Sequence, residues 1–126
     1  MSVYLYPVMK TYLVSLGSNE NRAENMMRCK QLLETYFQDI VYSEILETEP
    51  VGEGFKGMFY NCLSVVNSDC ELSYIKQVLK GIEKKMGRKS TDKSQGIVII
   101  DLDVLAVNEL IIKKDDFART TLRRLR

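Results

Sequence analysis

The sequence predicts a single domain over residues 1–126, of the α+β class, with two helices packed on one face of a mainly antiparallel sheet. Two stretches repeat apolar residues every three or four positions, which is typical of amphipathic helices. Short β-rich runs come before, between and after these stretches. A length of 126 residues is enough for one hydrophobic core, and no repeat, low-complexity segment or linker divides the chain.

Six elements are expected, in the order β-α-β-β-α-β. This order corresponds to a ferredoxin-like arrangement, in which the face of the sheet opposite the helices stays open for chemistry. A weakly patterned lead precedes the first element, and a turn with a short return follows the last one. The expected elements cover residues 11–16 (strand), 22–37 (helix), 40–46 (strand), 59–66 (strand), 69–86 (helix) and 97–107 (strand).

The elements of the first half have recognisable ends. The strand over residues 11–16 stops at a small polar turn, Gly17-Ser18-Asn19. Asn21 followed by Glu24 resembles a capping box and predicts the start of the first helix. Polar residues interrupt the β-rich run over residues 40–46 without excluding a strand.

The second helix has the clearest signature in the chain. Ser68 and Glu71 form a capping-box pattern, apolar residues then recur every three or four positions, and Gly87 stands where a glycine commonly ends a helix. Before this helix, residues 59–66 alternate well enough to predict a strand. One face of that strand would carry Phe59, Asn61, Leu63 and Val65.

Two carboxylates interrupt the last strand. Residues 97–107 are otherwise almost unbroken apolar sequence, which predicts a central strand buried on both faces. Asp101 and Asp103 are two positions apart, so their side chains share one face at roughly 6.7 Å spacing. Their mutual repulsion costs on the order of 2 kcal/mol at an effective dielectric of about 20. A compensating cation is therefore expected, and paired carboxylates suit Mg²⁺.

A polar loop with three basic residues precedes these carboxylates. Arg88, Lys89 and Lys93 stand there among serine, threonine, glutamine and glycine, which favours a phosphate site beside the carboxylate pair. Two plainer interpretations stay open. The aspartates could lie on a solvated edge, or one of them could pair with Arg88 or a lysine.

Composition limits the other possibilities. The formal net charge is +1, which gives no overall basic field for nucleic acid or membrane surfaces. No apolar run or leader pattern predicts a membrane span or signal peptide, so a cytoplasmic location is expected, while the oligomeric state stays undetermined. Cys29, Cys62 and Cys70 are predicted to be reduced core thiols. The absence of histidine leaves carboxylates, cations and positioning to supply any catalysis.

Four ordered motifs carry a resemblance to a known family. They are Leu16-Gly17-Ser18-Asn19, Glu47-Thr48-Glu49-Pro50-Val51-Gly52, Tyr60-Asn61, and the segment from Ile82-Glu83 through Gly87-Arg88 to Ile100-Asp101-Leu102-Asp103. Over residues 11–112, this set resembles 6-hydroxymethyl-7,8-dihydropterin pyrophosphokinase, a Mg²⁺-dependent folate-pathway enzyme that transfers pyrophosphate from ATP to a pterin. Each motif alone is weak, whereas the ordered set is specific.

The resemblance implies roles for matching residues. Asp101 and Asp103 would hold two Mg²⁺ ions that bridge the ATP phosphates. Arg88, with these aspartates, would be catalytic. The pterin pocket would be lined by Thr48, Val51, Phe59 and Asn61, and the nucleotide would be contacted by Glu83, Arg88, Lys89 and Lys93. Without the resemblance, Phe59 would be interpreted as core, Asn61 as a strand-end cap, and residues 48–50 as a turn.

The chain also departs from the family pattern. Ser90, Ser94 and Gln95 occupy a loop that is arginine-rich in the family, and Val98 replaces an arginine. Lysine is a poorer partner for phosphate than arginine, because it lacks the bidentate fork. A Pro-His segment with a later arginine and phenylalanine is not found in this sequence. Partial substitutes for these residues would be Arg119, Arg123 and Arg124.

Three functions therefore remain as hypotheses. The first is a divergent pterin pyrophosphokinase that uses ATP and Mg²⁺. The second is a non-catalytic relative that binds pterin or nucleotide after losing the arginines that clamp phosphate. The third is a ferredoxin-like interaction protein in which the aspartates are only structural.

Overall fold

The computed structural model describes residues 8–108. The lead over residues 1–7, the return over residues 110–112 and the residues Arg119, Arg123 and Arg124 lie outside this range. The elements are β1 (Lys10–Ser18), α1 (Arg22–Tyr36), β2 (Ile40–Tyr42), β3 (Leu46–Thr48), β4 (Phe59–Ser68), α2 (Leu72–Lys85), the 3-10 turn η1 (Lys93–Gln95) and β5 (Asp101–Val107).

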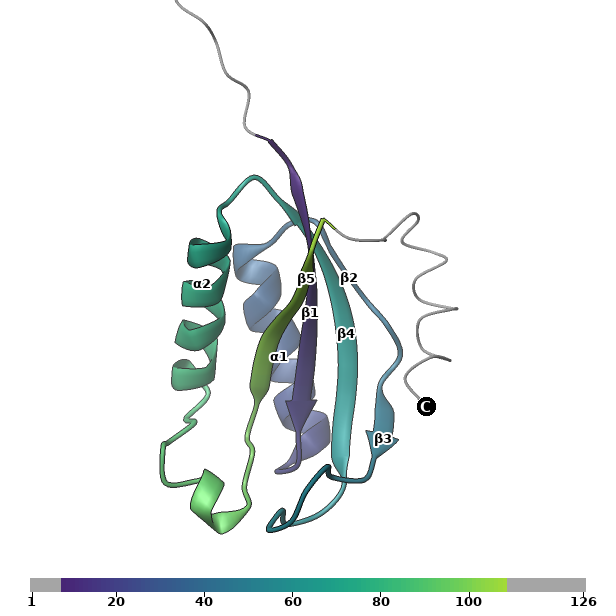
Figure 1. Ribbon diagram of the computed structural model, residues 1–126, viewed down its shortest axis with the longest axis vertical. Helices are drawn as coiled ribbons and strands as arrows, with labels where there is room; N and C mark the ends of the chain where they lie inside the picture. Colours follow the sequence, from purple (N-terminus) through teal and green to yellow (C-terminus); the bar gives the residue numbers. More distant parts are fainter. Residues whose placement is uncertain (1–7, 109–126) are drawn as a thin grey trace, which may run out of the picture.

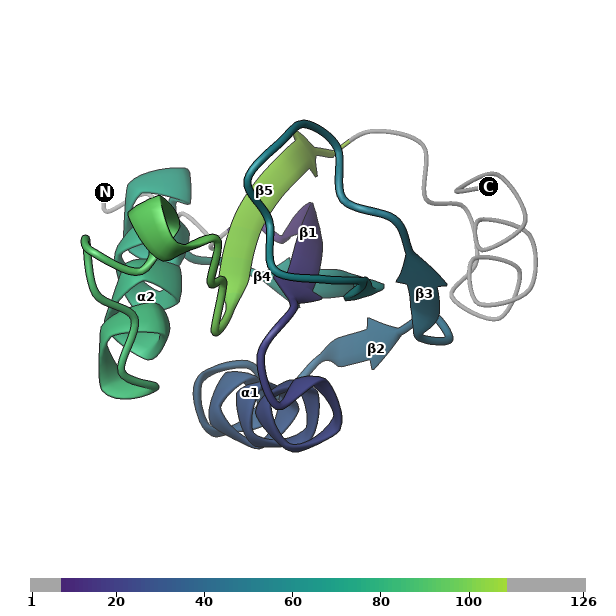
Figure 2. The same cartoon turned by 90° about the horizontal axis from the view of Figure 1, so that it is seen from below.

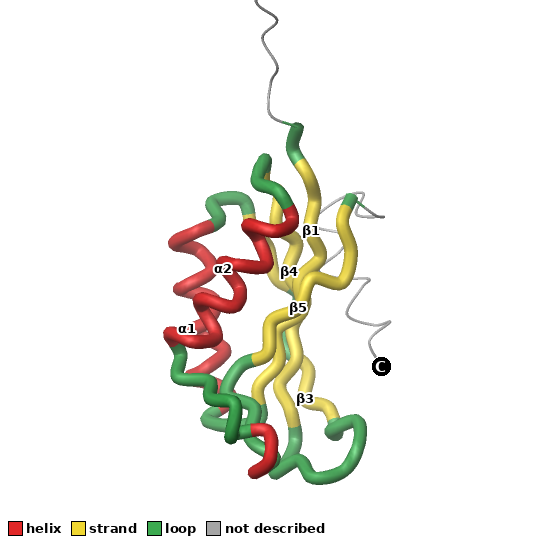
Figure 3. The backbone as a smooth tube through the Cα atoms, turned by 60° about the vertical axis from the view of Figure 1, so that its left-hand side comes forward, coloured by secondary structure: helices red, strands yellow, loops and turns green. Residues whose placement is uncertain are grey.

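These elements form two layers, with α1 and α2 on one face of an antiparallel sheet (Figures 1 and 3). The strand order is β2-β4-β1-β5, and β3 pairs with β4 on the same side as β2. The face opposite α1 and α2 is called here the open face. This arrangement confirms the predicted α+β, ferredoxin-like class.

The main core lies between the helices and the sheet. Alternate residues of β1, namely Tyr12, Val14 and Leu16, point into it and are fully buried. Burial of such side chains stabilises the fold by about 1.5–3 kcal/mol each, so β1 is a main contributor to the stability of the core. The helices contribute Met26, Cys29 and Leu33 from α1, and Ile75, Leu79 and Ile82 from α2. Within residues 8–108, no helix is long and apolar enough to cross a membrane.

The cysteines are free thiols. Cys29 and Cys62 are buried, as predicted, while Cys70 is partly exposed. Burial raises the pKa of Cys29 to about 12 and also raises that of Cys62, so both remain protonated near neutral pH.

Several predicted strand ends and both predicted helix caps are wrong. β1 extends through Ser18, because Gly17 and Ser18 pair with β4 instead of forming the expected turn. The strand over residues 40–46 is divided into β2 and β3 at Ser43, whose hydroxyl accepts a hydrogen bond from the Leu63 amide. Neither helix has a side-chain cap: Ser68 still belongs to β4, and Asn21 adopts a left-handed backbone (φ 41°).

The prediction of a central strand over residues 97–107 is also wrong. Only residues 101–107 of this stretch form a strand, and within residues 8–108 β5 is at the edge of the sheet, paired to β1 alone. Leu102 and Val104 pack against the main core, whereas Leu105 on the open face is 55% exposed. The apolar run reflects burial of β5 on one face only. The unpaired backbone groups at its free edge bond to the side chains of Glu83 and Arg88.

Candidate functional site

Glu83, Arg88 and Asp101 form an ion-paired cluster at the free edge of β5. The Arg88 guanidinium donates hydrogen bonds to the Glu83 carboxylate (2.6 Å), the Asp101 carboxylate (3.0 Å) and the Ile100 carbonyl (3.2 Å). Glu83 also accepts a hydrogen bond from the Leu102 amide (2.9 Å). Edge strands expose unpaired backbone groups, and here a side chain from α2 and one just beyond it satisfy two of them. The cluster therefore closes the edge of the sheet.

The end of α2 places Arg88 in this cluster. Gly87 has a φ of +94°, and its amide bonds the Lys84 carbonyl while the Arg88 amide bonds the Glu83 carbonyl. This is the Schellman motif, and it confirms Gly87 as the residue that ends the helix. Because the motif reverses the chain within two residues, the Arg88 side chain lies beside Glu83, one turn back.

The cluster has consistent electrostatics. Burial raises the pKa of Glu83, although the Leu102 amide and Arg88 act in the opposite direction. Burial alone would lower the pKa of Arg88, but the Glu83 and Asp101 carboxylates outweigh it and raise that pKa. Partial burial and the adjacent Asp101 carboxylate raise the pKa of Asp103. Arg88 is thus the cation that the carboxylate pair requires, as one of the plainer interpretations anticipated.

Asp101 and Asp103 lie on the open face, as their spacing predicts. Their partners across β1 are Gly17 and Ser15, whereas the intervening Leu102 packs into the main core. Mg²⁺ commonly binds through one or two carboxylates and completes its shell with water and phosphate oxygens. No cluster of three or more metal-ligating side chains occurs within residues 8–108. The donor set therefore fits a Mg²⁺ ion shared with a bound phosphate, and not an all-protein cage.

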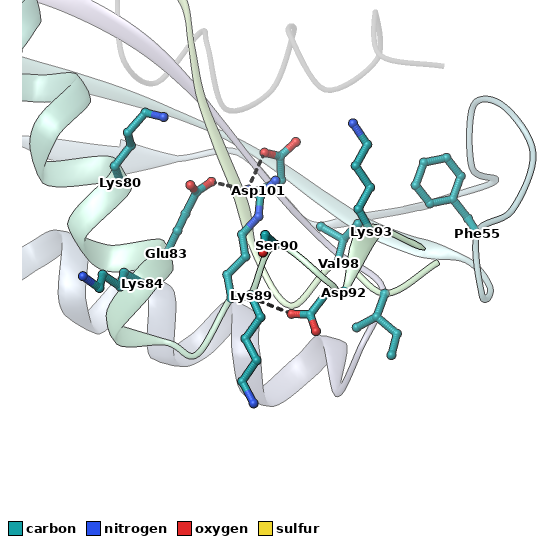
Figure 4. Close-up of a pocket in the computed structure, with 12 residues that line it drawn as sticks. Phe55, Lys80, Glu83, Lys84, Lys89, Ser90, Asp92, Lys93, Val98 and Asp101 are labelled. Carbon is teal, nitrogen blue, oxygen red and sulfur yellow. Dashed lines mark hydrogen bonds and ion pairs between the residues drawn. The ribbon is translucent and has the colours of Figure 1, made fainter. Parts of the chain in front are cut away.

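A charged cavity of about 590 Å³ adjoins this cluster (Figure 4). Its basic wall comes from two elements: Lys80 and Lys84 on α2, and Lys89 and Lys93 in the following loop. A smaller cavity of about 350 Å³ adds Lys76, and both cavities contain Glu83, Arg88 and Asp101. Sequence reasoning found the loop lysines but missed those on α2. Their four-residue spacing from Lys76 to Lys84, close to Glu83, is the signal that could have identified them.

A second, largely neutral pocket of about 180 Å³ lies on the open face. Leu46, Leu63 and Leu105 contribute apolar surface to it, while Thr48 and Asn61 contribute polar atoms. The Asn61 Nδ2 group donates a hydrogen bond to the Thr48 hydroxyl, which joins β4 to β3 at the pocket. Two residues predicted to bind the same ligand are thus brought together.

The other two residues of that predicted set lie outside this pocket. Val51 is 95% exposed in the loop between β3 and β4. Phe59 is half-buried at the start of β4 and contacts Phe55 edge-on, with ring centroids 5.4 Å apart. Phe55, which the sequence did not single out, lines the charged cavity from the same loop.

Three loops meet at one end of the sheet (Figure 2). The Asn19 side chain donates to the Gly96 carbonyl (2.8 Å) and accepts from the Val98 amide (2.6 Å). Gly96 has a φ of +72°, and a Cβ there would stand 2.0 Å from the Gly54 carbonyl oxygen. With the hydrogen bond from the Lys56 amide to the Gly96 carbonyl (3.0 Å), these contacts join the loops after β1, β3 and α2 near Gly96. Val98, where the family pattern has an arginine, contributes an apolar wall to the charged cavity.

Comparison with known proteins gives matches in sequence and in structure. The family model described as 7,8-dihydro-6-hydroxymethylpterin-pyrophosphokinase (HPPK) matches residues 13–123. The Folic acid synthesis protein FOL1 of Dictyostelium discoideum is 32% identical over 104 residues, which are 82% of this chain and 16% of that protein. The chain thus spans about a sixth of the length of that relative.

Two solved structures match this chain at low similarity. The C-terminal domain of the MgtC protein from Mycobacterium tuberculosis has a TM-score of 0.41 and 7% identity, with 88% of this chain and 100% of that chain covered. The de novo designed protein LFR1 1 with ferredoxin fold has a TM-score of 0.37 and 12% identity, with 76% and 85% covered.

Proposed function

Because this chain belongs to the 7,8-dihydro-6-hydroxymethylpterin-pyrophosphokinase family, we propose that it transfers a pyrophosphoryl group from ATP to 6-hydroxymethyl-7,8-dihydropterin in folate biosynthesis. One observation carries the proposal beyond family membership. The carboxylate pair adjoins two unlike pockets: Asp101 lines both charged cavities, and Asp103 lines the smaller one and is paired across β1 with Ser15, which lines the neutral pocket. A charged co-substrate and a flat heterocycle would meet at these carboxylates.

The charged cavity is the proposed site for the ATP phosphates. Arg88 would contact them and in doing so exchange part of its pairing with Asp101 for pairing with phosphate oxygens. Glu83 would keep Arg88 in place through their 2.6 Å contact. Lys89 and Lys93, together with Lys80 and Lys84, would add positive charge without the bidentate geometry of arginine.

The neutral pocket is the proposed site for the pterin. Thr48 and Asn61 would bind its polar edge through hydrogen bonds, because an amide offers both donor and acceptor atoms. Phe59 and Val51 would reach the ring only if the loop between β3 and β4 closes further over the open face. Ordering of that loop on binding is part of the proposal.

The chemistry requires alignment more than covalent help from the protein. The hydroxymethyl oxygen would form a bond to the β-phosphorus while the bond from that phosphorus to the oxygen of AMP breaks. When bound by Asp101 and Asp103, Mg²⁺ would neutralise phosphate charge, and the family pattern suggests two such ions. The protein would hold the two substrates in line, which suits a chain that lacks histidine.

A non-catalytic relative is the second candidate. Its supporting observation is that Arg88 is already bound by two carboxylates, while Val98 stands where the family pattern has a further arginine. Loss of one phosphate clamp costs about 2–4 kcal/mol at a transition state, or on the order of a hundredfold or more in rate. Such a protein would bind its ligands without turnover.

The test follows AMP release from ATP, Mg²⁺ and 6-hydroxymethyl-7,8-dihydropterin, with Asp103→Ala beside the parent. We expect AMP from the parent and a loss of at least about a hundredfold in the variant, because one metal-binding carboxylate is removed. Asp69→Ala, which removes an exposed carboxylate next to α2, is the control and should retain full activity. Pterin binding by calorimetry without AMP release would favour the non-catalytic candidate, and a parent that binds neither substrate would contradict both.

A further inference from the structure

Gly17 is an unusual residue for its place in the fold. It lies in β1, which pairs with β4 on one side and with β5 on the other, and it is buried. Glycine in a strand weakens it, because a side chain that could pack is missing. Gly17 is not among the glycines with positive φ, so backbone conformation does not require it.

The space around position 17 requires glycine there. A Cβ built on Gly17 would stand 2.9 Å from the Asn61 Oδ1 atom, and the next neighbour, the Tyr60 carbonyl oxygen, would be 4.0 Å away. Real Cβ atoms essentially never approach an oxygen that closely. The Asn61 side chain therefore occupies the volume that any other residue at position 17 would fill.

The register explains what this arrangement does. Asn61, Gly17 and Asp101 form one row across β4, β1 and β5. The Asn61 Nδ2 group faces β3, where it donates to the Thr48 hydroxyl, so the Oδ1 atom lies on the side of β1. The missing side chain leaves that oxygen as a hydrogen-bond acceptor directed along the row toward the carboxylates.

We propose that Gly17 is a positioning residue for the heterocyclic substrate. Its lack of a side chain lets the Asn61 amide lie over β1, so that Oδ1 accepts a hydrogen bond from an N–H group of a flat ring on the open face. The inference rests on the proposed function. It predicts that Gly17 acts through Asn61 on the pterin and not on ATP.

A double-mutant cycle tests this directly. The variants are Gly17→Ala, Asn61→Ala and the double variant, and the readouts are Kd for 6-hydroxymethyl-7,8-dihydropterin, Kd for Mg²⁺-ATP and the urea midpoint of unfolding. Gly17→Ala should weaken pterin binding about tenfold, which corresponds to a lost or misdirected hydrogen bond, and change ATP binding less than about twofold. In the Asn61→Ala background, the same change should have almost no effect on pterin binding.

Gly81→Ala is the matched control. Gly81 lies in α2, and a Cβ there meets nothing within 4 Å, so an added methyl group should leave both dissociation constants unchanged. If Gly17→Ala does not fold, the double variant should restore folding, because Asn61→Ala removes the oxygen that the methyl group meets. Failure of the double variant to do so would overturn the inference.

The outcomes separate this inference from the proposed function. Suppose that the parent binds pterin and that the fold-losses of pterin affinity in the two single variants multiply in the double variant. That result would overturn the role of Gly17 and leave the proposed function intact. A parent that binds no pterin would overturn the proposed function, and the substrate role of Gly17 with it. Non-additive losses confined to pterin would establish that Gly17 positions Asn61.

Discussion

The two halves of the candidate site are built in opposite ways. At the edge of β5, charged side chains lie in partly exposed ion pairs, and Glu83 and Arg88 also satisfy the backbone of that strand. On the open face, Asn61 is neutral. One hydrogen bond to Thr48 holds its side chain, and the absence of a side chain at Gly17 leaves room for it. At the edge, the groups that stabilise the fold are the same groups that we propose bind the nucleotide. On the open face these two tasks would be separate, so truncation of Asn61 should change binding more than stability.

The largest effect expected from this difference is on stability. Glu83→Ala leaves the Leu102 amide without its partner and removes the anion that holds Arg88, so the free energy of unfolding should fall by about 2 kcal/mol. Urea denaturation measures this loss. Asn61→Ala, half-buried on the open face, should cost less than about 1 kcal/mol.

Glu83→Gln provides the matched control, because its amide oxygen can still accept from Leu102. We expect it to retain more than half of the lost stability. If the glutamine and alanine variants are equally unstable, the charge and not the cap on β5 is the source of the effect. If Asn61→Ala is as destabilising as Glu83→Ala, the proposed difference between edge and open face is wrong.

The sequence patterns predicted well those features of the fold that depend on residues close together in the sequence. The three-four spacing identified α1 and α2, because it records which side of a helix is buried. The two-residue repeat of a strand correctly assigned Asn61 and Leu63 to one face of β4. Strand order is not local. The apolar run before and within β5 carries no sign that its edge is covered by Glu83 and Arg88 from the region of α2.

The candidate site was likewise predictable only in part. Asp101, Arg88 and Glu83 were named from motifs, and the structure brings them together. The importance of Gly17 was not visible, because it depends on register between three strands, and the residue was taken for a turn. The roles of individual side chains in binding stay predictions that the variants described here test.

Arg88→Lys should have a smaller effect on stability but a clear one on nucleotide binding. Lysine can keep one contact with Glu83, yet it cannot bond Glu83, Asp101 and the Ile100 carbonyl together as the guanidinium does. We expect Mg²⁺-ATP binding to weaken about tenfold, or about 1.4 kcal/mol, with pterin binding unchanged. Isothermal calorimetry with each ligand separately measures both. Equal losses for ATP and pterin would show that Arg88 shapes the whole site and not the charged half alone.

The smallest effect concerns the lysines that sequence reasoning missed. Lys80 lies in the wall of both charged cavities, whereas Lys85 on the same helix lines neither. Lys80→Ala should weaken Mg²⁺-ATP binding about threefold at 50 mM salt. At 300 mM salt the fold-change should drop to about 1.5, because exposed charges are screened. Lys85→Ala is the control with the same loss of charge. If both variants weaken binding equally, the basic surface of α2 acts only through net charge. A loss specific to Lys80, combined with pterin binding that is insensitive to salt, would establish that only the edge half of the site works through charge.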